Sequence, residues 1–455
     1  MKWTDKQFEA ISDRDHNLMV AAAAGSGKTA VLVERIIRMV CNEENPVDID
    51  RLLIVTFTNA AAAEMRERIS RAIEKKLEEC PENEHLQRQA ALLHNAQITT
   101  IDSFCLFVIR NNFNDIGLDP GFRVADEGEL KLLKQDVLAD LLEKNYAEGN
   151  KEFLDCVEYF TGGSNDRLLE EYIGKLYEFS MSYPWPEEWL SERSEDYKIT
   201  SVSEMEQSPW CTYITDYIKL SLRECGDKLT LARKIAEEPA GPYFYGKMLE
   251  DEAAMLCKLS EKDSFSDLYQ AWEGITFGRL PGKKDETVDE ELKKRVQVLR
   301  NQVKKQIEEL GNAYFVLSPD QIVSRMEQAA YPVATLLLLV KTFKEELDAR
   351  KRSANIIGFG DMEHFALNIL LKKKADGSYE ATEAAKEYRC FFHEILIDEY
   401  QDSNLVQEYL LWAVSGEEDG NFNRFMVGDV KQSIYKFRLA RPELFLEKYR
   451  TYETK

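Results

Sequence analysis

Apolar and polar positions alternate in two regular ways near the beginning of the chain. Residues 18–21 and 52–55 are uninterrupted apolar runs, which are typical of short strands buried on both faces. Apolar residues at helical spacing follow each run and predict helices over 28–40 and 60–79. Strands that alternate with helices favour a parallel sheet covered by helices, so we expect an α/β fold.

Three further short segments have a composition that is typical of strands. A third strand is predicted at 98–101, and two more at 394–397 and 424–427. Because the strand pattern returns there, we interpret the last two as strands of the same sheet, although they lie hundreds of residues after the first three.

The stretch between these groups has a different pattern. It is rich in Glu, Lys, Leu and Tyr at helical spacing, as in 130–146 and 290–310. We therefore expect a mostly α-helical domain at 120–350, inserted into an α/β domain formed by residues 1–119 and 351–455.

Composition and charge narrow the functional classes. The longest apolar run, 333–340, is much shorter than the ~20 residues that a membrane span needs, and residues 1–10 are polar. The eight cysteines form no C-x-x-C pair, which favours reduced thiols. We therefore expect a cytoplasmic protein with no membrane partner.

The formal net charge of −23 argues against a broad nucleic-acid-binding surface. One local stretch differs, because residues 424–450 contain seven basic and three acidic residues, a balance of 7 − 3 = +4. By charge alone this stretch fits a nucleic-acid groove and a solvated helix face equally well.

A glycine-rich turn follows the first predicted strand and leads into the first helix. Its small residues would let backbone N–H groups approach a phosphate, and the helix N-terminus adds positive potential. The Lys28 ammonium would reach the β- and γ-phosphates, and the Thr29 hydroxyl would bind Mg²⁺. The strict pattern of such loops has glycine where Ala22 stands. The predicted ATP-binding residues of this turn are Ala22, Ala23, Ala24, Gly25, Ser26, Gly27, Lys28 and Thr29.

Two carboxylates follow the strand predicted at 394–397. Ligands bind at the carboxyl ends of strands in open α/β sheets. Asp398 could hold Mg²⁺, and Glu399 could polarise the attacking water as a general base. An acidic pair alone would equally fit a solvated turn, but together with a phosphate loop it predicts a nucleotide site.

Residues 427–438 combine an amide with alternating aromatic and basic side chains. Gln432 at a strand end could sense the γ-phosphate, while Tyr435, Phe437 and Arg438 offer stacking faces and phosphate partners for single-stranded nucleic acid. Composition alone would rather favour a helix start with two core aromatic residues.

In their order, these blocks resemble the motifs of superfamily 1 DNA helicases of the UvrD/PcrA/RecB group. Thr4-x-x-Gln7 resembles the motif whose glutamine reads adenine, and 22–29 resembles motif I, in which alanine at the first position is usual. Residues 56–65 and 100–105 resemble DNA-contacting motifs, and the blocks at 398–402 and 427–438 resemble motifs II and III. The resemblance implies DNA contacts for Phe57, Thr58, Asn59, Thr100, Ser103, Tyr435, Phe437 and Arg438.

The block at 20–32, with Ala30 where many simpler relatives carry arginine, is more similar to AddA-type helicase–nuclease subunits. The segments 119–127 and 277–281 are similar to them too. This resemblance implies a RecA-like P-loop domain, ATP and Mg²⁺ as cofactors, and Glu399, Gln432 and Lys28 as catalytic residues. It also implies 3′→5′ movement along single-stranded DNA, an AddB-like partner subunit, duplex ends as substrate, and a role in double-strand-break repair and recombination with an associated exonuclease.

Two alternatives remain at this stage. A non-motor, ATP-gated module that binds single-stranded DNA would carry the same motifs, although intact Glu399 and Gln432 argue against it. A P-loop kinase or other NTPase would lack the block at 56–59. The family's second RecA-like domain supplies arginines that this chain does not contain in a recognisable pattern after Arg438. We therefore expect residues 1–455 alone to be nearly inactive in hydrolysis.

Overall fold

The computed structural model describes residues 3–23, 25–163, 165–283, 285–374, 376–433 and 439–453. The chain divides into two compact units. The sheet unit comprises Met1–Gly149, Asn165–Leu190 and Leu338–Lys455, and the helical unit comprises Asn150–Ser164 and Ser191–Leu337.

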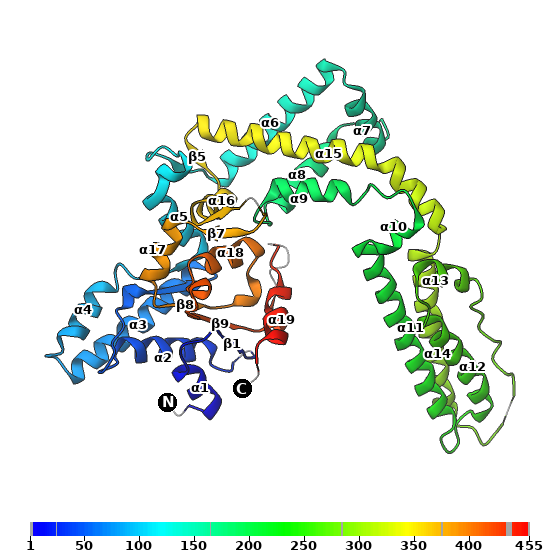
Figure 1. The fold of residues 1–455 in the computed structure, drawn as a ribbon. Coiled ribbons are helices and arrows are strands. Elements are labelled where there is room, and N and C mark those ends of the chain that lie inside the picture. The colour runs from blue at the N-terminus through cyan, green and yellow to red at the C-terminus, as the bar shows by residue number, and fades with distance from the viewer. Residues whose placement is uncertain are drawn as a thin grey trace. The chain divides into compact units, whose positions relative to one another are not determined.

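The centre of the sheet unit is a parallel sheet. Within the described residues it has five strands in the order β1-β9-β8-β2-β3 (Figure 1). Their bounds are β1 Leu18–Ala21, β2 Leu52–Thr56, β3 Gln97–Thr100, β8 Glu394–Ile397 and β9 Arg424–Gly428. The five predicted strands and the α/β class are thus confirmed, with β3 starting one residue earlier than expected.

Helices cover both faces of the sheet because alternate residues of each strand point to opposite sides. Leu53 and Val55 of β2 pack in one apolar cluster with α5 (Ile101–Asn112), α16 (Phe359–Leu370) and α18 (Leu405–Ala413). The intervening residues of β2 pack on the other face, in a cluster that includes apolar side chains of three further helices. Those helices are α1 Asp5–Ser12, α2 Lys28–Val40 and α3 Asn59–Glu79.

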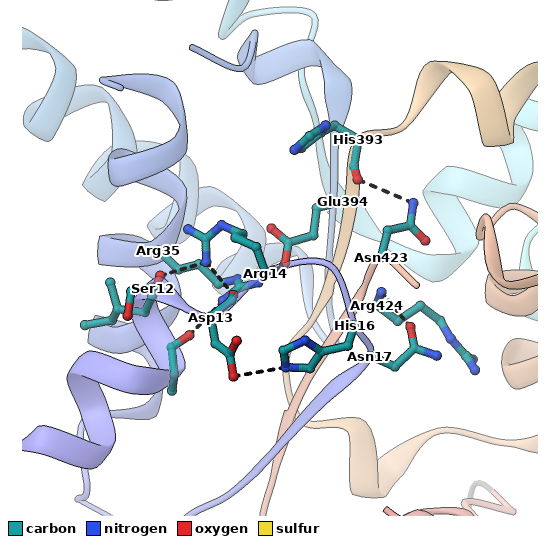
Figure 2. Close-up of polar contacts among 12 residues, drawn as sticks. Ser12, Asp13, Arg14, His16, Asn17, Arg35, His393, Glu394, Asn423 and Arg424 are labelled. Atoms are coloured by element: carbon teal, nitrogen blue, oxygen red, sulfur yellow. Dashed lines mark hydrogen bonds and ion pairs between the residues drawn. The ribbon is translucent and has the colours of Figure 1, made fainter. Parts of the chain in front are cut away.

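The N-terminal edge of the sheet contains buried charges. Arg35 of α2 donates from Nε to Glu394 Oε1 over 2.8 Å and from Nη1 to the carbonyl of Ala10 over 2.8 Å. Figure 2 shows Arg14 beside this pair and Asn17 beside Arg424, whose backbone N–H donates to Asn17 Oδ1 over 3.0 Å. Charged residues at the beginnings of β8 and β9 therefore join the strands to α1, α2 and the loop before β1.

The remaining elements of the sheet unit frame this core. A short parallel pair joins β4 (Arg123–Val124) to β5 (Ile356–Ile357), and an antiparallel pair joins β6 (Leu371–Lys373) to β7 (Tyr379–Ala381). The other helices that lie wholly in this unit are α4 Glu84–Leu92, α6 Glu127–Glu148, α8 Arg167–Ser180, α17 Glu383–Phe391 and α19 Pro442–Thr451.

In the helical unit, α11 packs against α12 and α14, and the apolar sides of these long helices form its core. A buried ion pair adds to this core, because Arg300 Nε of α14 lies 2.8 Å from Glu252 Oε2 of α12. The helices of this unit are α7 Lys151–Thr161, α10 Val202–Gln207, α11 Pro209–Ala236, α12 Gly246–Ser260, α13 Phe265–Trp272 and α14 Glu290–Tyr314. Two helices, α9 Pro186–Glu195 and α15 Pro319–Ser353, have residues in both units.

The compact units differ from the domain boundaries expected at 119/120 and 350/351. Helices α6 and α8 and the end of α15 pack within the sheet unit. There Arg350 Nη2 lies 2.6 Å from Asp140 Oδ2, and the rings of Tyr177 and Phe343 meet at 5.3 Å. A change of composition marks where helices begin along the chain, but not which neighbours their apolar sides find.

None of the helices in the described ranges combines the length and apolar character that a membrane crossing requires.

Candidate functional site

The loops that follow the five strands all lie at one edge of the sheet, because the strands are parallel. The phosphate-loop segment follows β1, the acidic pair follows β8, and Asp429 and Gln432 follow β9. Thr29, the acidic pair and Gln432 line one cavity of about 360 Å³ at this edge. It is lined by Thr29, Phe57, Thr58, Ala61, Glu64, Met65, Arg68, Asp398, Glu399, Gln401, Asp402 and Gln432.

Two glycines give the loop after β1 its shape. Gly25 and Gly27 have φ values of +75° and +82°, in the left-handed region that a side chain disfavours. Gly27 is the N-cap of α2, and Lys28 is the first residue of that helix. The Ser26 hydroxyl oxygen is buried and has no hydrogen-bond partner among the described residues. A buried hydroxyl without a partner fits a loop that closes on phosphate oxygens.

Gln7 supports this loop from α1. Its side chain accepts from the Thr4 N–H over 3.0 Å, as part of a capping box at the start of α1. The amide nitrogen then donates to the Ser26 carbonyl over 3.0 Å. The structure therefore places Gln7 against the phosphate loop, and its contact with adenine stays a prediction.

The acidic pair faces the phosphate-loop lysine. Lys28 Nζ lies 3.5 Å from Glu399 Oε2, and the two residues are 371 positions apart in the sequence. Glu399 has φ +53°, a left-handed backbone that is uncommon outside glycine and that often marks functional sites. Burial, and next the Glu399 carboxylate, raise the pKa of Asp398 to about 6. A cation beside Asp398 would offset this cost of burying its charge.

The Gln401 side chain joins the acidic pair to the loop after β9. Its Nε2 donates to Glu399 Oε2 over 2.9 Å, and its Oε1 accepts from the Asp429 N–H over 2.9 Å. The Asp429 carboxylate in turn accepts from Gln432 Nε2 over 2.5 Å. This bond is the main reason that the pKa of Asp429 is lowered.

The donor set fits ATP with Mg²⁺. Thr29 offers a hydroxyl and Asp398 a carboxylate toward the same cavity. Mg²⁺ in nucleotide sites usually takes one or two protein oxygens and completes its shell with phosphate and water. In the described part of the chain no group of three or more His, Cys, Asp or Glu is arranged around a metal position.

The profile of the UvrD/REP helicase N-terminal domain family matches residues 3–453. This chain belongs to that family. The expected membership of the UvrD-like helicases is therefore confirmed.

Several curated relatives of this family member are described as the A subunit of an ATP-dependent helicase/nuclease. The protein from Lachnoclostridium phytofermentans is 50% identical over 99% of this chain and 33% of its own length. Those from Clostridium perfringens and Geobacillus thermodenitrificans are 48% and 45% identical over 99% of this chain, and 36% and 37% of their own lengths. The chain thus spans about a third of the length of the curated relatives it matches, and its likeness to AddA-type subunits is confirmed.

Five of the residues that the helicase resemblance assigns to DNA lie at the same edge of the sheet: Phe57, Thr58, Asn59, Thr100 and Ser103. Phe57 lines the cavity described above, while Thr58 caps α3 by accepting from Ala61 N–H over 3.1 Å. Asn59 and Ser103 are exposed at the beginnings of α3 and α5. Their contact with DNA stays a prediction.

Thr100 is in a different position from these residues. Its side chain is buried and caps α5, accepting from the Ser103 N–H over 3.3 Å. A direct contact of this hydroxyl with DNA would therefore compete with the helix cap.

The predicted contacts of Ala24, Tyr435, Phe437 and Arg438 lie outside the described residues.

The basic stretch from 424 to 450 does not act as one surface. Arg424 is buried and donates from Nη1 to Glu408 Oε1 over 2.9 Å, with its other nitrogen near Glu417. Lys448 of α19 lies 2.8 Å from the same Glu408 oxygen. Acidic side chains therefore pair with both of these basic residues, and Arg424 fits neither a nucleic-acid groove nor a solvated helix face because it is buried.

Sequence reasoning gave no role to two buried side chains at this edge. One is Gln401, and the other is Glu363 of α16, which accepts from Gln407 Nε2 over 2.7 Å and from Asn404 Nδ2 over 3.2 Å. Burial raises the pKa of Glu363 to about 7. Glu363 lines a second cavity of about 210 Å³ that also borders Phe57. The sequence signal for Gln401 was its place in the block 398–402, which resembles motif II.

Proposed function

We propose that this chain is the ATP-binding first motor domain of a DNA helicase that moves 3′→5′ along single-stranded DNA. Within its full-length protein it would work with an AddB-like partner and a nuclease on duplex ends, in double-strand-break repair and recombination. The names of the relatives support the helicase and nuclease activities. The resemblance to AddA-type subunits supports the 3′→5′ direction of movement and the AddB-like partner.

One observation carries the nucleotide part of this proposal. Lys28 and Glu399 are 371 residues apart, and their side chains meet at 3.5 Å at the carboxyl edge of one parallel sheet. ATP hydrolysis needs a cation that binds the phosphates and a carboxylate that activates the attacking water. Lys28 at a helix N-terminus and Glu399 at the end of another strand of the same sheet supply these two groups.

Each residue then has a separate task. Lys28 and the N–H groups at the start of α2 bind and orient the phosphates. Thr29 and Asp398 would hold Mg²⁺, which neutralises charge that develops on the phosphate oxygens. Glu399 accepts the proton of the attacking water, a general-base role that contributes ~10²–10⁴ in rate. Gln432 reports the presence of the γ-phosphate to the residues that follow it.

The proposal is tested by binding and hydrolysis measured separately. We expect residues 1–455 to bind a fluorescent ATP analogue with Mg²⁺, and Lys28→Ala to abolish that binding. Lys76→Ala, an exposed position on α3 whose ammonium pairs with Glu79, serves as the matched control and should bind normally. Unchanged nucleotide affinity in Lys28→Ala would refute the phosphate-loop assignment.

DNA binding is followed by anisotropy of a labelled single strand. The affinity should decrease with added salt, because phosphate contacts release counterions. Hydrolysis by residues 1–455 should stay very slow and be stimulated by DNA only in the full-length protein. A full-length protein that binds both ligands without hydrolysing ATP would instead be a non-motor, ATP-gated DNA-binding module.

A further inference from the structure

The Gln401 side chain is enclosed between the ends of β8 and β9, with only 1% of its surface exposed. Its Nε2 donates to Glu399 Oε2 over 2.9 Å and to Asp402 Oδ2 over 3.2 Å. Its Oε1 accepts from the Asp429 N–H over 2.9 Å. The two ends of the amide therefore have different partners, and turning it over would break all of these bonds.

The fit around this amide is tight on the β9 side. A Cβ atom added at Gly428 would lie 2.4 Å from Gln401 Oε1 and 2.9 Å from Phe445 Cε2. Only a glycine lets the end of β9 approach the amide so closely. A displacement of Gln401 must therefore move the loop after β9, since there is no free space to absorb it.

Two chains of hydrogen bonds continue from Gln401 into that loop. Through Asp429, the first reaches Gln432, whose amide donates to the Asp429 carboxylate over 2.5 Å. Through Asp402, the second reaches Ser433, whose hydroxyl donates to Asp402 Oδ1 over 3.1 Å. Both end directly before residues 434–438, the block to which the sequence assigns DNA contacts.

The opposite end of the connection is loosely held. Glu399 has 38% of its side chain exposed, and its lysine contact is 3.5 Å long. A nucleotide in the cavity can therefore change the partners of Glu399 at low cost. Gln401 is buried, so an amide N–H left without an acceptor would be costly. When Glu399 moves, the Gln401 side chain should therefore move with it and keep the hydrogen bond between them.

We propose that Gln401 is a positioning residue that transmits the state of the nucleotide site from Glu399 to residues 429–433, and so couples ATP binding to DNA binding. The inference rests on the proposed function. It adds the side chain that makes the physical connection between the acidic pair and the Gln432 loop.

The chain contains a matched control for this side chain. Gln89 of α4 is equally buried, donates to Asp48 Oδ1 over 2.6 Å and accepts from the Ile49 N–H over 2.8 Å. It thus makes the same kinds of bonds as Gln401, to a carboxylate and to a backbone N–H, but it lies outside the cavity at the strand ends.

The experiment measures the affinity of the full-length protein for a labelled single strand, with and without a non-hydrolysable ATP analogue and Mg²⁺. The ratio of the two affinities is the coupling factor, typically ~5–150-fold where sites are linked. Gln401→Met removes both ends of the amide, and Gln401→Glu keeps the acceptor but loses the donor. We expect the ratio to approach one in both variants, with a much smaller change in the affinity for each ligand alone.

The Gln89→Met and Gln89→Glu variants should keep the wild-type ratio even if their unfolding temperatures decrease as much. A general loss of packing would not change the ratio selectively at one glutamine. A preserved ratio in both Gln401 variants, or an equal loss in the Gln89 variants, would overturn the inference while leaving the proposed function intact. A coupling factor of one in a wild-type protein that binds both ligands would likewise overturn the inference and leave the proposed function intact. Wild-type protein that fails to bind the nucleotide would refute the proposed function itself.

Discussion

The two edges of the central sheet use charge in opposite ways, although the same two strands supply both. At their beginnings, β8 and β9 contain Glu394 and Arg424, which are buried. Figure 2 shows Glu394 beside Arg35, and Arg424 pairs with Glu408. After their ends come Asp398, Glu399 and Asp429, which face a cavity or solvent. The Arg35 side chain is 1% exposed in its pair with Glu394, whereas Glu399 is 38% exposed in its contact with Lys28.

This difference separates structural charge from functional charge. A buried charge that loses its partner is left unsolvated, so the N-terminal edge is costly to disturb. In the pair of Lys28 and Glu399 only the carboxylate is partly exposed, at 38% against 9% for the lysine side chain, and the contact is 3.5 Å long. A long contact with a carboxylate that water can reach contributes little, so a ligand can replace it easily. We expect substitutions at the two edges to differ accordingly, in stability at one and in ligand response at the other.

The largest effect is expected at the N-terminal edge. Glu394→Ala leaves the Arg35 guanidinium buried without its carboxylate, and the free energy of unfolding should decrease by ~3–5 kcal/mol. The measurement is denaturant unfolding. Glu64→Ala, which breaks the exposed pair with Arg68, is the control and should change stability little. Equal losses in the two variants would contradict the contrast between the edges.

The buried side-chain carboxyl group of Glu363, near the C-terminal ends of the strands, should make stability depend on pH. Glu363 has amide partners, and its pKa is raised from 4.5 to about 7. Between these values the folded chain holds a proton that the unfolded chain has lost. Stability should therefore decrease as pH rises from 4.5 to 7 and be level above that, by ~3 kcal/mol in total for this group.

Glu363→Gln should remove this part of the pH dependence. Thermal unfolding of both proteins at several pH values between 5 and 8 measures it. The unfolding temperature of the wild type should approach or fall below that of the variant as pH rises. Parallel curves would show that the carboxyl does not titrate in this range.

Nucleotide should stabilise the wild-type chain through the carboxyl edge. A ligand at 100 times its Kd adds ~2.7 kcal/mol to the free energy of unfolding. In Asp398→Asn this gain from the Mg²⁺–nucleotide complex should be largely lost, while the ligand-free protein stays at least as stable. The reason is that burial already disfavours the charge of Asp398. Thermal unfolding with and without Mg²⁺ and nucleotide tests this, and an undiminished gain would exclude Asp398 as a metal ligand.

The smallest change in stability is expected for Glu399→Gln. The contact of its carboxylate with Lys28 is 3.5 Å long, and the Glu399 side chain is 38% exposed. The free energy of unfolding should therefore change by less than ~1 kcal/mol. Hydrolysis by the full-length protein should nevertheless decrease ~10²–10⁴-fold, because the general base is lost. Single-turnover hydrolysis measures the second effect. A large loss of stability would mean that this edge is structural too.

The sequence by itself determined the local elements and the chemical groups. Short runs rich in apolar and β-branched residues indicated all five strands of the sheet, and three of them (β2, β8 and β9) are buried along their whole length. Glycines before Lys28 indicated a turn that only they can form, and the order of the motifs indicated the family. Strand ends and their polar residues are local properties, so the expected nucleotide site could be proposed from the order of residues alone.

Only the tertiary structure decided which side chains meet. The ion pairs of Arg424 and Lys448 depend on Glu408, and the hydrogen bonds of Gln401 depend in part on Asp429, which follows another strand. The packing of α6 and α8 with the sheet unit is of the same kind. Such contacts join residues far apart in the chain, and their energies depend on burial and distance. A pattern along the sequence contains neither quantity, and both exist only once the strands have been placed side by side.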